Sequence, residues 1–461
     1  MKNKLINILL FISVAFSIYG QQTKYVFYFI GDGMGLNHVN GTEMYIAEKG
    51  GNNGINSLCF TQFPISNFAT SFSANSFITD SGAAGTALAS GVKTNNGSIG
   101  VDENGKKVYS IASKAKKTGK KVGVISNVGV DNATPAAFYA HQKNRSMTYE
   151  IATDLPKSEF DFFAGSGFEL SKKKEKATIY KLFSDAGYTV VKGYDDYKAK
   201  LHSEKIILIQ KEGKNIQCFP YAMDRKADDL TLPQITEAAI TTLNKNNKNG
   251  FFLMVEGGKI DWAAHSNDAA TVFNEVIDLD KAVQVAFEFY KKHPKETLII
   301  VTADHETGGL GLGSGPYALN LKALANQQVS LERLSAYIKE LRIMKNHHVA
   351  WEDVRLLLRE KLGFWKSLPI TWNDEKILHD EFEESFVKNH AVYQKNMHSK
   401  NEPLAAKAIQ ILNKISLISW CSNGHSASHV PFYAIGAGSQ LFNGKMDNTD
   451  IPKRIAKAAN Y

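Results

Sequence analysis

The side chains of this sequence that could do chemistry stand where apolar runs end in glycines. The apolar run 251–255 is followed by Glu256, two glycines, Asp261 and His265. Because Asp261 and His265 are four residues apart, a helix would present both on one face. A carboxylate and an imidazole placed together are ligands that zinc accepts. The alternative at this point is a helix that Asp261 caps, with His265 on its surface.

Two other apolar runs end in the same way. The run 24–30 leads into Asp32, which has a glycine on each side, and the run 296–302 leads into Asp304 and His305. By itself, an aspartate among glycines is most often a turn residue. The sequence Gly-Asp-Gly-Met-Gly lacks the Gly-x-Gly-x-x-Gly spacing of dinucleotide-binding proteins, so a dinucleotide site is poorly supported.

Ser81 opens a stretch of small residues that Gly91 ends. Its alanines and glycines predict a closely packed helix from about Ser81 to the residue before Gly91. A serine at a helix N-terminus is either the cap or a nucleophile whose hydroxyl sits in a positive field suited to receiving a phosphoryl group. The segment alone leaves both roles open.

Thr134 follows a further apolar run, 122–126, and precedes Pro135. Proline is favoured in the first turn of a helix, so we expect Thr134 to cap a helix that continues through His141 to Arg145. An arginine at such a place is ordinarily a surface residue.

The order of these segments predicts an α/β fold. Apolar runs alternate with helical patterns, which is typical of a mainly parallel, doubly wound central sheet flanked by helices. Residues 21–461 would form a single domain of this kind. In such a sheet the carboxyl ends of the strands meet at one edge, where Asp32, Glu256 and Asp304 would come together.

Residues 311–419 interrupt this alternation. We expect a helical insertion there that covers the end of the sheet carrying the site, with His347 and His348 exposed rather than acting as ligands. Its helical stretches are predicted at 331–344, 351–364, 374–390 and 403–415.

Composition restricts the class of protein and its location. With 43% hydrophobic and 22% charged residues, the 461-residue chain is typical of soluble globular proteins. Lys2 and Lys4 precede the apolar run 5–18, which predicts a signal peptide over residues 1–20 and an exported, periplasmic or extracellular protein with no membrane span. Without those two lysines the net charge of +8 becomes +6. The lysine-rich runs lack interleaved aromatics, so no nucleic-acid groove is expected.

The three cysteines, Cys59, Cys218 and Cys421, are far apart in the sequence. Their spacing does not match a metal site, and at most one disulfide could form. We expect a fold that does not depend on them.

Carboxylates and imidazoles gathered at one sheet edge, without a cofactor fingerprint, are best explained by a cluster of divalent metals. At this point the chain resembles the alkaline phosphatases, metal-dependent phosphomonoesterases, over nearly all of residues 25–455 apart from the helical insertion. Six segments carry the resemblance in the family's order: FIGDGMG, TDSGAAGTALASG, ATPAAFYAH with Arg145, VEGGKIDWAAH, VTADHETGG and a late histidine before VPFYAIGAG.

The resemblance implies a centre of two Zn²⁺ ions and one Mg²⁺ ion. One zinc would be held by Asp261, His265 and His425. The second would be held by Asp32, Asp304 and His305, with the Ser81 oxygen completing its coordination. The magnesium would be held by Asp32 again, Thr134 and Glu256.

The implied reaction is hydrolysis of a phosphate monoester. Ser81 is the implied nucleophile, because metal coordination lowers the pKa of a hydroxyl that is otherwise unreactive. It would form a phosphoserine that water then cleaves, while Arg145 grips two phosphate oxygens. Relatives are commonly homodimers, so a homodimer is a further expectation.

Three residues depart from the family pattern or vary within it. Asn132 stands two residues before Thr134, where relatives carry Asp or His, so the identity of the third metal stays open. Trp262 follows Asp261 where relatives carry Lys, His or Trp, and an indole brings no positive charge to the phosphate. Ser426 replaces a common threonine. His425 rather than His429 matches the family's late histidine.

Two kinds of rival function remain. A sulfatase of the same superfamily needs C/S-x-P-x-R, whereas Ser81 is followed by Gly-Ala-Ala. Phosphodiesterases of the superfamily tend to use threonine and lack the phosphate-gripping arginine. An exported protein that binds metal or phosphate without catalysis should lack a nucleophile or a zinc ligand, and all of them have a candidate here.

Overall fold

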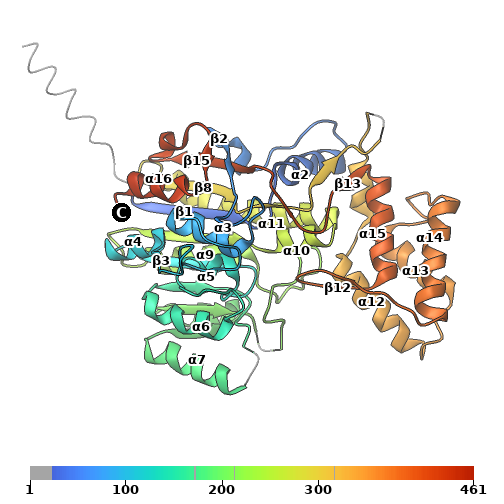
Figure 1. The fold of residues 1–461 in the computed structure, drawn as a ribbon, viewed down its shortest axis with the longest axis horizontal. Coiled ribbons are helices and arrows are strands. Elements are labelled where there is room, and N and C mark those ends of the chain that lie inside the picture. Colours follow the sequence, from blue (N-terminus) through green and yellow to red (C-terminus); the bar gives the residue numbers. More distant parts are fainter. Residues whose placement is uncertain (1–22, 171–172, 212, 316) are drawn as a thin grey trace, which may run out of the picture.

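The computed structural model describes residues 23–170, 173–211, 213–315 and 317–461. The predicted signal peptide, residues 1–20, lies outside this part of the chain. The fold is built around one large sheet with the strand order β16-β2-β15-β8-β1-β7-β3-β4-β6-β5 (Figure 1). Its strands are β1 (Tyr25–Gly31), β2 (Ile65–Thr70), β3 (Lys121–Ser126), β4 (Phe162–Ala164), β5 (Thr189–Lys192), β6 (Ile206–Ile209), β7 (Phe251–Gly257), β8 (Thr297–Ala303), β15 (Val430–Gly436) and β16 (Met446–Asp447).

The sheet is mostly parallel, which confirms the predicted fold class. Every neighbouring pair from β8 through β1, β7, β3, β4 and β6 to β5 is parallel. β15 runs antiparallel to both β8 and β2, so the sheet is mixed at that side. All residues of β1, β7 and β8 are buried, because parallel strands covered on both faces need unbroken apolar sequence.

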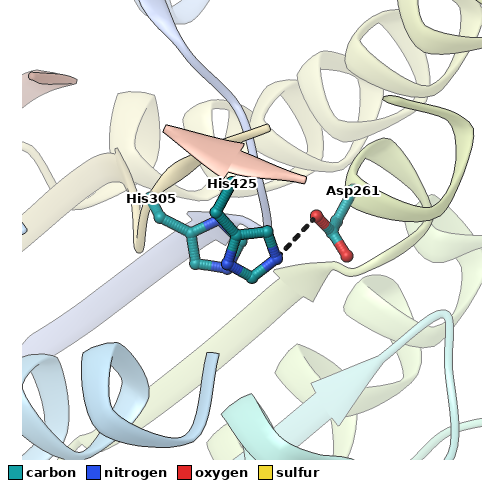
Figure 2. A group of neighbouring side chains, drawn as sticks. All are labelled: Asp261, His305 and His425. Carbon is teal, nitrogen blue, oxygen red and sulfur yellow. Dashed lines mark ion pairs between the residues drawn. The ribbon is translucent and has the colours of Figure 1, made fainter. Parts of the chain in front are cut away.

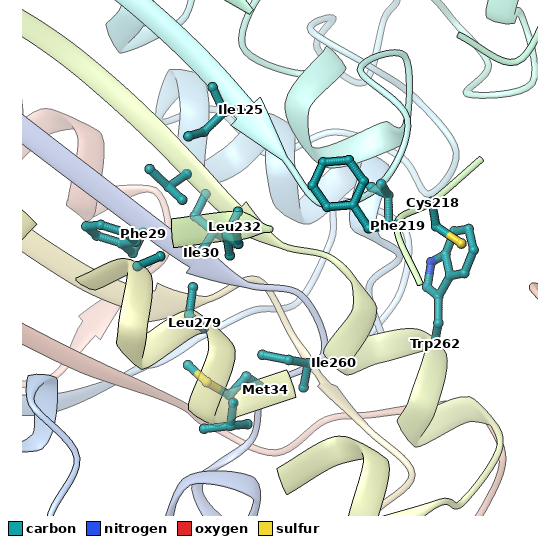
Figure 3. Close-up of a cluster of buried hydrophobic side chains, with 14 of the residues drawn as sticks. Phe29, Ile30, Met34, Ile125, Cys218, Phe219, Leu232, Ile260, Trp262 and Leu279 are labelled. Atoms are coloured by element: carbon teal, nitrogen blue, oxygen red, sulfur yellow. The ribbon is translucent and has the colours of Figure 1, made fainter. Parts of the chain in front are cut away.

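Helices flank the sheet and supply the rest of the core. They are α2 (Leu36–Lys49), α3 (Ser81–Ser90), α4 (Ile111–Lys117), α5 (Ala133–Ala136), α6 (Thr148–Asp154), α7 (Lys173–Asp185), α8 (Tyr194–Ala199), α9 (Leu232–Asn244), α10 (Lys259–His265), α11 (Ala269–Lys292) and α16 (Asp450–Ala459). Figure 3 shows how Phe29 and Ile30 of β1 share one buried cluster with Ile260 of α10 and Leu279 of α11. This packing anchors the segments that carry the site.

The helix expected from Asp261 to about Asp280 is two helices. α10 ends at His265, Asn267 adopts a left-handed conformation with φ of 53°, and Asp268 caps α11 by accepting a hydrogen bond from the Thr271 N–H at 3.2 Å. The alanine-rich pattern runs through both helices, so periodicity alone did not reveal the break. The break leaves Asp261 and His265 on a short helix of their own.

The helix expected to carry Arg145 is also shorter than predicted. α5 ends at Ala136, and its cap is Asn132 rather than Thr134, since the Asn132 side chain accepts a hydrogen bond from the Ala133 N–H at 2.7 Å. Arg145 lies on the loop that follows, where its backbone N–H donates to the Gly97 carbonyl at 2.7 Å.

The described part of 311–419 contains four α-helices, which gather at one end of the molecule beyond α10 (Figure 1). The helices α12 and α15 match the predicted bounds, α13 ends two residues early, and α14 passes into a π-helical turn at Glu383–Val387. His347 and His348 are exposed, as expected. The α-helices are α12 (Leu331–Met344), α13 (Trp351–Leu362), α14 (Trp372–Phe382) and α15 (Pro403–Ile415).

Among the residues that the structure describes, three short antiparallel strand pairs lie outside the large sheet. They are β9 (Glu306–Thr307) with β14 (His425–Ser426), β10 (Leu310–Leu312) with β13 (Ile418–Trp420), and β11 (Gln394–Lys395) with β12 (Lys400–Asn401). Cys59, Cys218 and Cys421 are free thiols. Among the described residues, no helix has the length and apolar character needed to cross a membrane.

Candidate active site

Three neighbouring strands bring the carboxylates of the site together. Asp32 follows β1, Asp304 follows β8, and Glu256 is the last residue but one of β7. In the sheet register Ile30 pairs with Glu256, and Gly31 pairs with Ala303. The three acids therefore stand at one level of the carboxyl edge, where open α/β sheets place their sites.

Gly33 allows the loop after β1 to approach α10 closely. Its φ is +69°, and a Cβ on it would lie 2.8 Å from both Asp261 Oδ1 and Thr307 Oγ1. A larger residue would be strained in its backbone and would collide with the site. This explains why Asp32 is followed by glycine.

His425 reaches the site through the small strand pair that follows His305. β14 pairs with β9 so that His425 stands opposite Thr307. Figure 2 shows the His425 ring beside that of His305 and facing Asp261. The two ring centroids are 3.6 Å apart, and His425 Nε2 lies 3.7 Å from Asp261 Oδ1. His429 instead packs edge-on against Phe68, with centroids 4.9 Å apart.

The three histidines of the cluster have their Nδ1 atoms occupied by the protein. His265 Nδ1 pairs with the Asn423 carbonyl at 2.5 Å, His425 Nδ1 with the Thr79 carbonyl at 2.8 Å, and His305 Nδ1 with Thr307 Oγ1 at 3.3 Å. Such partners orient the ring and leave Nε2 for a metal, as is usual for ligating histidines.

The Nε2 atoms converge with oxygens at separations that suit a metal shell. His305 Nε2 lies 3.2 Å from Ser81 Oγ, 3.2 Å from Asp32 Oδ1 and 3.4 Å from Asp304 Oδ2. Ligands at ordinary zinc distances on a tetrahedron are about 3.3 Å apart. The donor set of Asp32, Asp304 and His305 is one of three groups in the described chain able to hold a metal.

A second group of atoms converges around Asp261. His265 Nε2 lies 3.3 Å from Asp261 Oδ2 and 3.2 Å from His425 Nε2. Asp261 does not cap α10, whose N-cap is Gly258, so the capping alternative is wrong. Its Oδ1 instead accepts a hydrogen bond from Thr307 Oγ1 at 2.5 Å.

Four buried oxygens of this region make no hydrogen bond within the described structure. They belong to Thr134, Glu256, Asp32 and Asp304. Buried polar atoms are almost always satisfied, and an unsatisfied group often marks a site for an ion. Carboxylate and hydroxyl oxygens are ligands of hard cations such as magnesium. The residues therefore fit a group of divalent metals.

The electrostatics of the acids also favour cations. Burial raises the pKa of Asp32, and repulsion from Asp304 and Asp261 raises it further. Burial likewise raises the pKa of Asp304 to about 7 and that of Glu256 to about 8. Carboxylates crowded in a buried site resist ionisation until a positive charge joins them.

The histidines respond to the same surroundings. Burial and the nearby His425 hold the pKa of His305 well below its ordinary value, so its imidazole is neutral and able to ligate. Burial opposes the ionisation of Asp261, but His265, His398 and His425 together outweigh burial and hold the pKa of Asp261 well below its ordinary value.

Ser81 is the first residue of α3, and Asp80 rather than Ser81 is the cap. Asp80 Oδ1 accepts hydrogen bonds from the N–H groups of Ala83 and Gly97, both at 3.0 Å. Asp80 Oδ2 also receives Arg145 Nη1 at 3.1 Å. Ser81 Oγ is thereby free to face His305, while Arg145 is held by Asp80, the residue before Ser81.

A cavity of about 540 Å³ opens beside the candidate metal ligands. Arg145, Asn132, Trp262 and His398 are among its lining residues. It is large enough for a small ester, and an arginine on its wall suits an anion.

Three residues that contact the candidate site residues were missed by sequence reasoning. Asp80 had a signal, because it stands immediately before Ser81 in a segment already singled out, and so did Thr307, which follows Asp304-His305 by two residues. His398 had none. It lies between β11 and β12, over a hundred positions from Asp261.

Comparison with known proteins identifies the family of this chain. A family model described as alkaline phosphatase matches residues 23–163 and 172–461. The chain belongs to the alkaline phosphatase family. Alkaline phosphatase 4 of Bacillus subtilis is 35% identical over 387 residues, covering 82% of this chain and 76% of that protein. Alkaline phosphatase 3 of the same organism is 31% identical, covering 95% and 90%.

Solved structures of alkaline phosphatases share the fold. The cold-active enzyme of a Shewanella species superimposes with a TM-score of 0.80 at 27% identity, covering 94% of this chain and 99% of that one. The enzyme of the Antarctic bacterium TAB5 gives 0.67 at 26% identity, covering 95% and 99%. The chain is therefore a phosphatase, and its family supports hydrolysis of phosphate monoesters.

Proposed function

We propose that this alkaline phosphatase family member cleaves phosphate monoesters through a phosphoserine on Ser81, at a centre of two zinc ions and one magnesium ion. The observation that carries the proposal is the convergence of Ser81 Oγ, Asp32 Oδ1 and Asp304 Oδ2 on His305 Nε2, at 3.2 to 3.4 Å. A nucleophile that shares a site with three candidate metal ligands is the arrangement expected for metal-activated attack.

The ligands divide into three sets by their place in the cluster. Asp261, His265 and His425 would hold one zinc. Asp32, Asp304 and His305 would hold the other, next to Ser81. Asp32, Thr134 and Glu256 would hold magnesium, which suits their all-oxygen donors and the unsatisfied oxygens of Thr134 and Glu256.

The metals would supply Lewis-acid chemistry, lowering the pKa of the serine hydroxyl and neutralising charge on the phosphoryl oxygens. Arg145, braced by Asp80, would grip two of those oxygens and align phosphorus with Ser81 Oγ. Ser81 Oγ would bond to phosphorus as the bond to the alcohol breaks. Water would then cleave the phosphoserine and release inorganic phosphate.

Because of Asn132, the proposed third metal site differs from that of relatives, which carry Asp or His at this position. The side-chain oxygen of Asn132 caps α5, accepting from the Ala133 N–H, and the residue lines the cavity. An amide supplies neither the charge of Asp nor the imidazole of His, so Asp32, Thr134 and Glu256 carry the binding. A variant of the TAB5 enzyme has magnesium in its M3 site, and we infer magnesium here.

Export and dimerisation belong to the proposal as well. The support for export is the basic start and apolar run of residues 1–20. The support for a homodimer is the family resemblance alone. Light scattering on the mature chain would test the oligomeric state, and N-terminal sequencing of the secreted protein would test the cleavage site.

The test is hydrolysis of para-nitrophenyl phosphate and of the matching bis(para-nitrophenyl) diester at alkaline pH, with zinc and magnesium. We expect fast turnover of the monoester, abolished by EDTA and reduced at least about 10³-fold by Ser81→Ala. Ser90→Ala, the same change at the other end of α3, should retain activity. Acid quenching with ³²P-labelled substrate should trap the label on wild-type protein but not on Ser81→Ala.

A preference for the diester would move the protein to another branch of the superfamily. Bound zinc without turnover of either ester would identify a binding protein. Monoester turnover that survives in Ser81→Ala would disprove the phosphoserine route.

A further inference from the structure

The short pair β11–β12 reaches from the helical segment 311–419 into the site. Its turn is fastened to Ser266, the residue immediately after His265. Asn396 Nδ2 donates to Ser266 Oγ at 3.0 Å, Asn401 Nδ2 donates to the same oxygen at 3.3 Å, and Ser399 Oγ lies 3.3 Å from it. Three contacts on one hydroxyl give the turn a defined position beside α10.

Hydrogen bonds within the turn also fix its conformation. Asn396 Oδ1 accepts hydrogen bonds from the backbone N–H groups of His398 and Ser399, at 2.8 and 2.7 Å. Met397, at the tip, is 61% exposed, whereas the side chain of the next residue, His398, is only 11% exposed. The turn therefore directs His398 inward.

Inside the site, His398 lies flat against Trp262. The two rings are 4.4 Å apart between centroids with planes inclined by 7°. This stack fixes the plane of the imidazole, and its Nε2 lies 3.4 Å from Asp261 Oδ2. Trp262, which brings no charge to the phosphate, has a different use here as a platform for the histidine.

Asp261 Oδ2 thus faces two imidazole nitrogens at nearly equal distances. His265 Nε2 is 3.3 Å away and His398 Nε2 is 3.4 Å away. These are the separations of about 3.3 Å between ligands of a tetrahedral zinc shell. Asp261, His265 and His398 form one of the three groups in the described chain able to hold a metal.

We propose that His398 is a further ligand of the metal ion held by Asp261, His265 and His425 in the phosphate-free enzyme. This rests on the metal assignment of the proposed function and extends it to the segment 311–419. Four protein side chains would fill a tetrahedral zinc shell, whereas a catalytic zinc needs an open position or a fifth one. Incoming phosphate would then replace the His398 imidazole or enlarge the shell to five.

The competing role for His398 is a hydrogen bond to Asp261 Oδ2 that orients the carboxylate without touching the metal. Removing such an outer partner costs 10- to 100-fold in metal affinity. Loss of a direct ligand should lower the metal affinity by more than this. As a direct ligand, the His398 ring would lie at bonding distance from the metal.

The decisive experiment is a crystal structure of the zinc-loaded mature protein, grown without phosphate or sulfate, with anomalous data at the zinc edge. We expect His398 Nε2 at about 2.0–2.1 Å from the zinc at Asp261. An Nε2 atom more than about 3 Å from that zinc would overturn the proposal, whatever the enzyme's activity.

A solution measurement tests the same point without crystals. Chelator competition should show zinc affinity at one site lowered more than about 100-fold in His398→Ala. His348→Ala, which removes an exposed histidine of the same segment, should match wild type. Asn396→Ala, which removes one of the three contacts to Ser266 and both hydrogen bonds within the turn, should give an intermediate loss. A loss below 100-fold in His398→Ala would assign His398 to positioning and refute the ligand role.

The experiments distinguish failure of the His398 ligand role from failure of the proposed function. Zinc-dependent monoester turnover with His398 away from the metal would refute only the present inference. A zinc ion bonded to His398 in a protein that turns over no ester would uphold it and refute the proposed reaction.

Discussion

At the scale of single residues, the site depends on side chains that hold other side chains. Asp80 combines three tasks: it caps α3, binds the Gly97 N–H and braces Arg145. The cap leaves Ser81 Oγ free, and the ion pair preorganises the guanidinium for an anion, which reduces the entropy lost on binding.

Asp80→Asn should therefore weaken phosphate binding without dismantling the helix. The amide oxygen can still cap α3, but the charge that braces Arg145 is lost. We expect the inhibition constant for inorganic phosphate to rise roughly fivefold, about 1 kcal/mol. Steady-state kinetics with phosphate as inhibitor would measure it, with the exposed-site change Asp185→Asn as control. An unchanged inhibition constant would show that Arg145 needs no brace.

At the scale of elements, close backbone packing sets the distances within the site. α3 packs on α5, and a Cβ on Gly85 would lie 3.2 Å from Thr134 Cα and 3.3 Å from Ala137 Cβ. This contact places Ser81 of α3 and Thr134 of α5 on the same side of the sheet edge. A side chain larger than a methyl group at Gly85 would therefore push the two helices apart.

Gly85→Val should separate the two helices. Overpacking of this kind costs about 1–3 kcal/mol, so we expect a lower melting temperature and a reduced kcat, since Thr134 is a proposed magnesium ligand. Gly85→Ala should be close to neutral, because the gain in helix propensity of about 1 kcal/mol offsets the tight contact. Thermal denaturation and kcat measured on both variants would show whether Val has a larger effect than Ala. Equal effects of Ala and Val would exclude a packing cause.

At the scale of the whole molecule, the buried acids at the sheet edge link stability to pH and to metal. Without metal, Asp304 and Glu256 have pKa values raised by burial to about 7 and about 8. At these two carboxyls the folded state binds more protons than the unfolded chain from about pH 4 to pH 8. Their contribution to the free energy of unfolding therefore falls as the pH rises through that window.

The melting temperature of EDTA-treated protein should accordingly drop by several degrees between pH 5 and pH 8.5. Protein loaded with zinc and magnesium should lose less, because cations stabilise the ionised carboxylates. Asp131 and Glu275, whose pKa values burial raises to about 7, titrate in both forms, so the comparison isolates the metal cluster. Calorimetry at matched ionic strength would measure both forms, and parallel pH profiles would contradict the expectation.

By itself, the sequence determined the central strands β1, β3, β7 and β8 and the order of the chemical segments. Apolar runs such as those of β1, β7 and β8 form buried strands wherever they lie, and the acids after them must then meet at the carboxyl edge. The convergence of Asp32, Glu256 and Asp304 was predictable because it follows from local pattern and one general rule of parallel sheets.

Only the tertiary structure decided how the other residues reach that edge. The break after His265, the choice of Asp80 over Ser81 as cap, and the place of Arg145 on a loop depend on contacts that compete with local propensity. His425 arrives by pairing with β9, and His398 by a turn tied to Ser266. Those partners are far apart in the sequence, and periodicity, which reports only neighbours along the chain, carries no information about them.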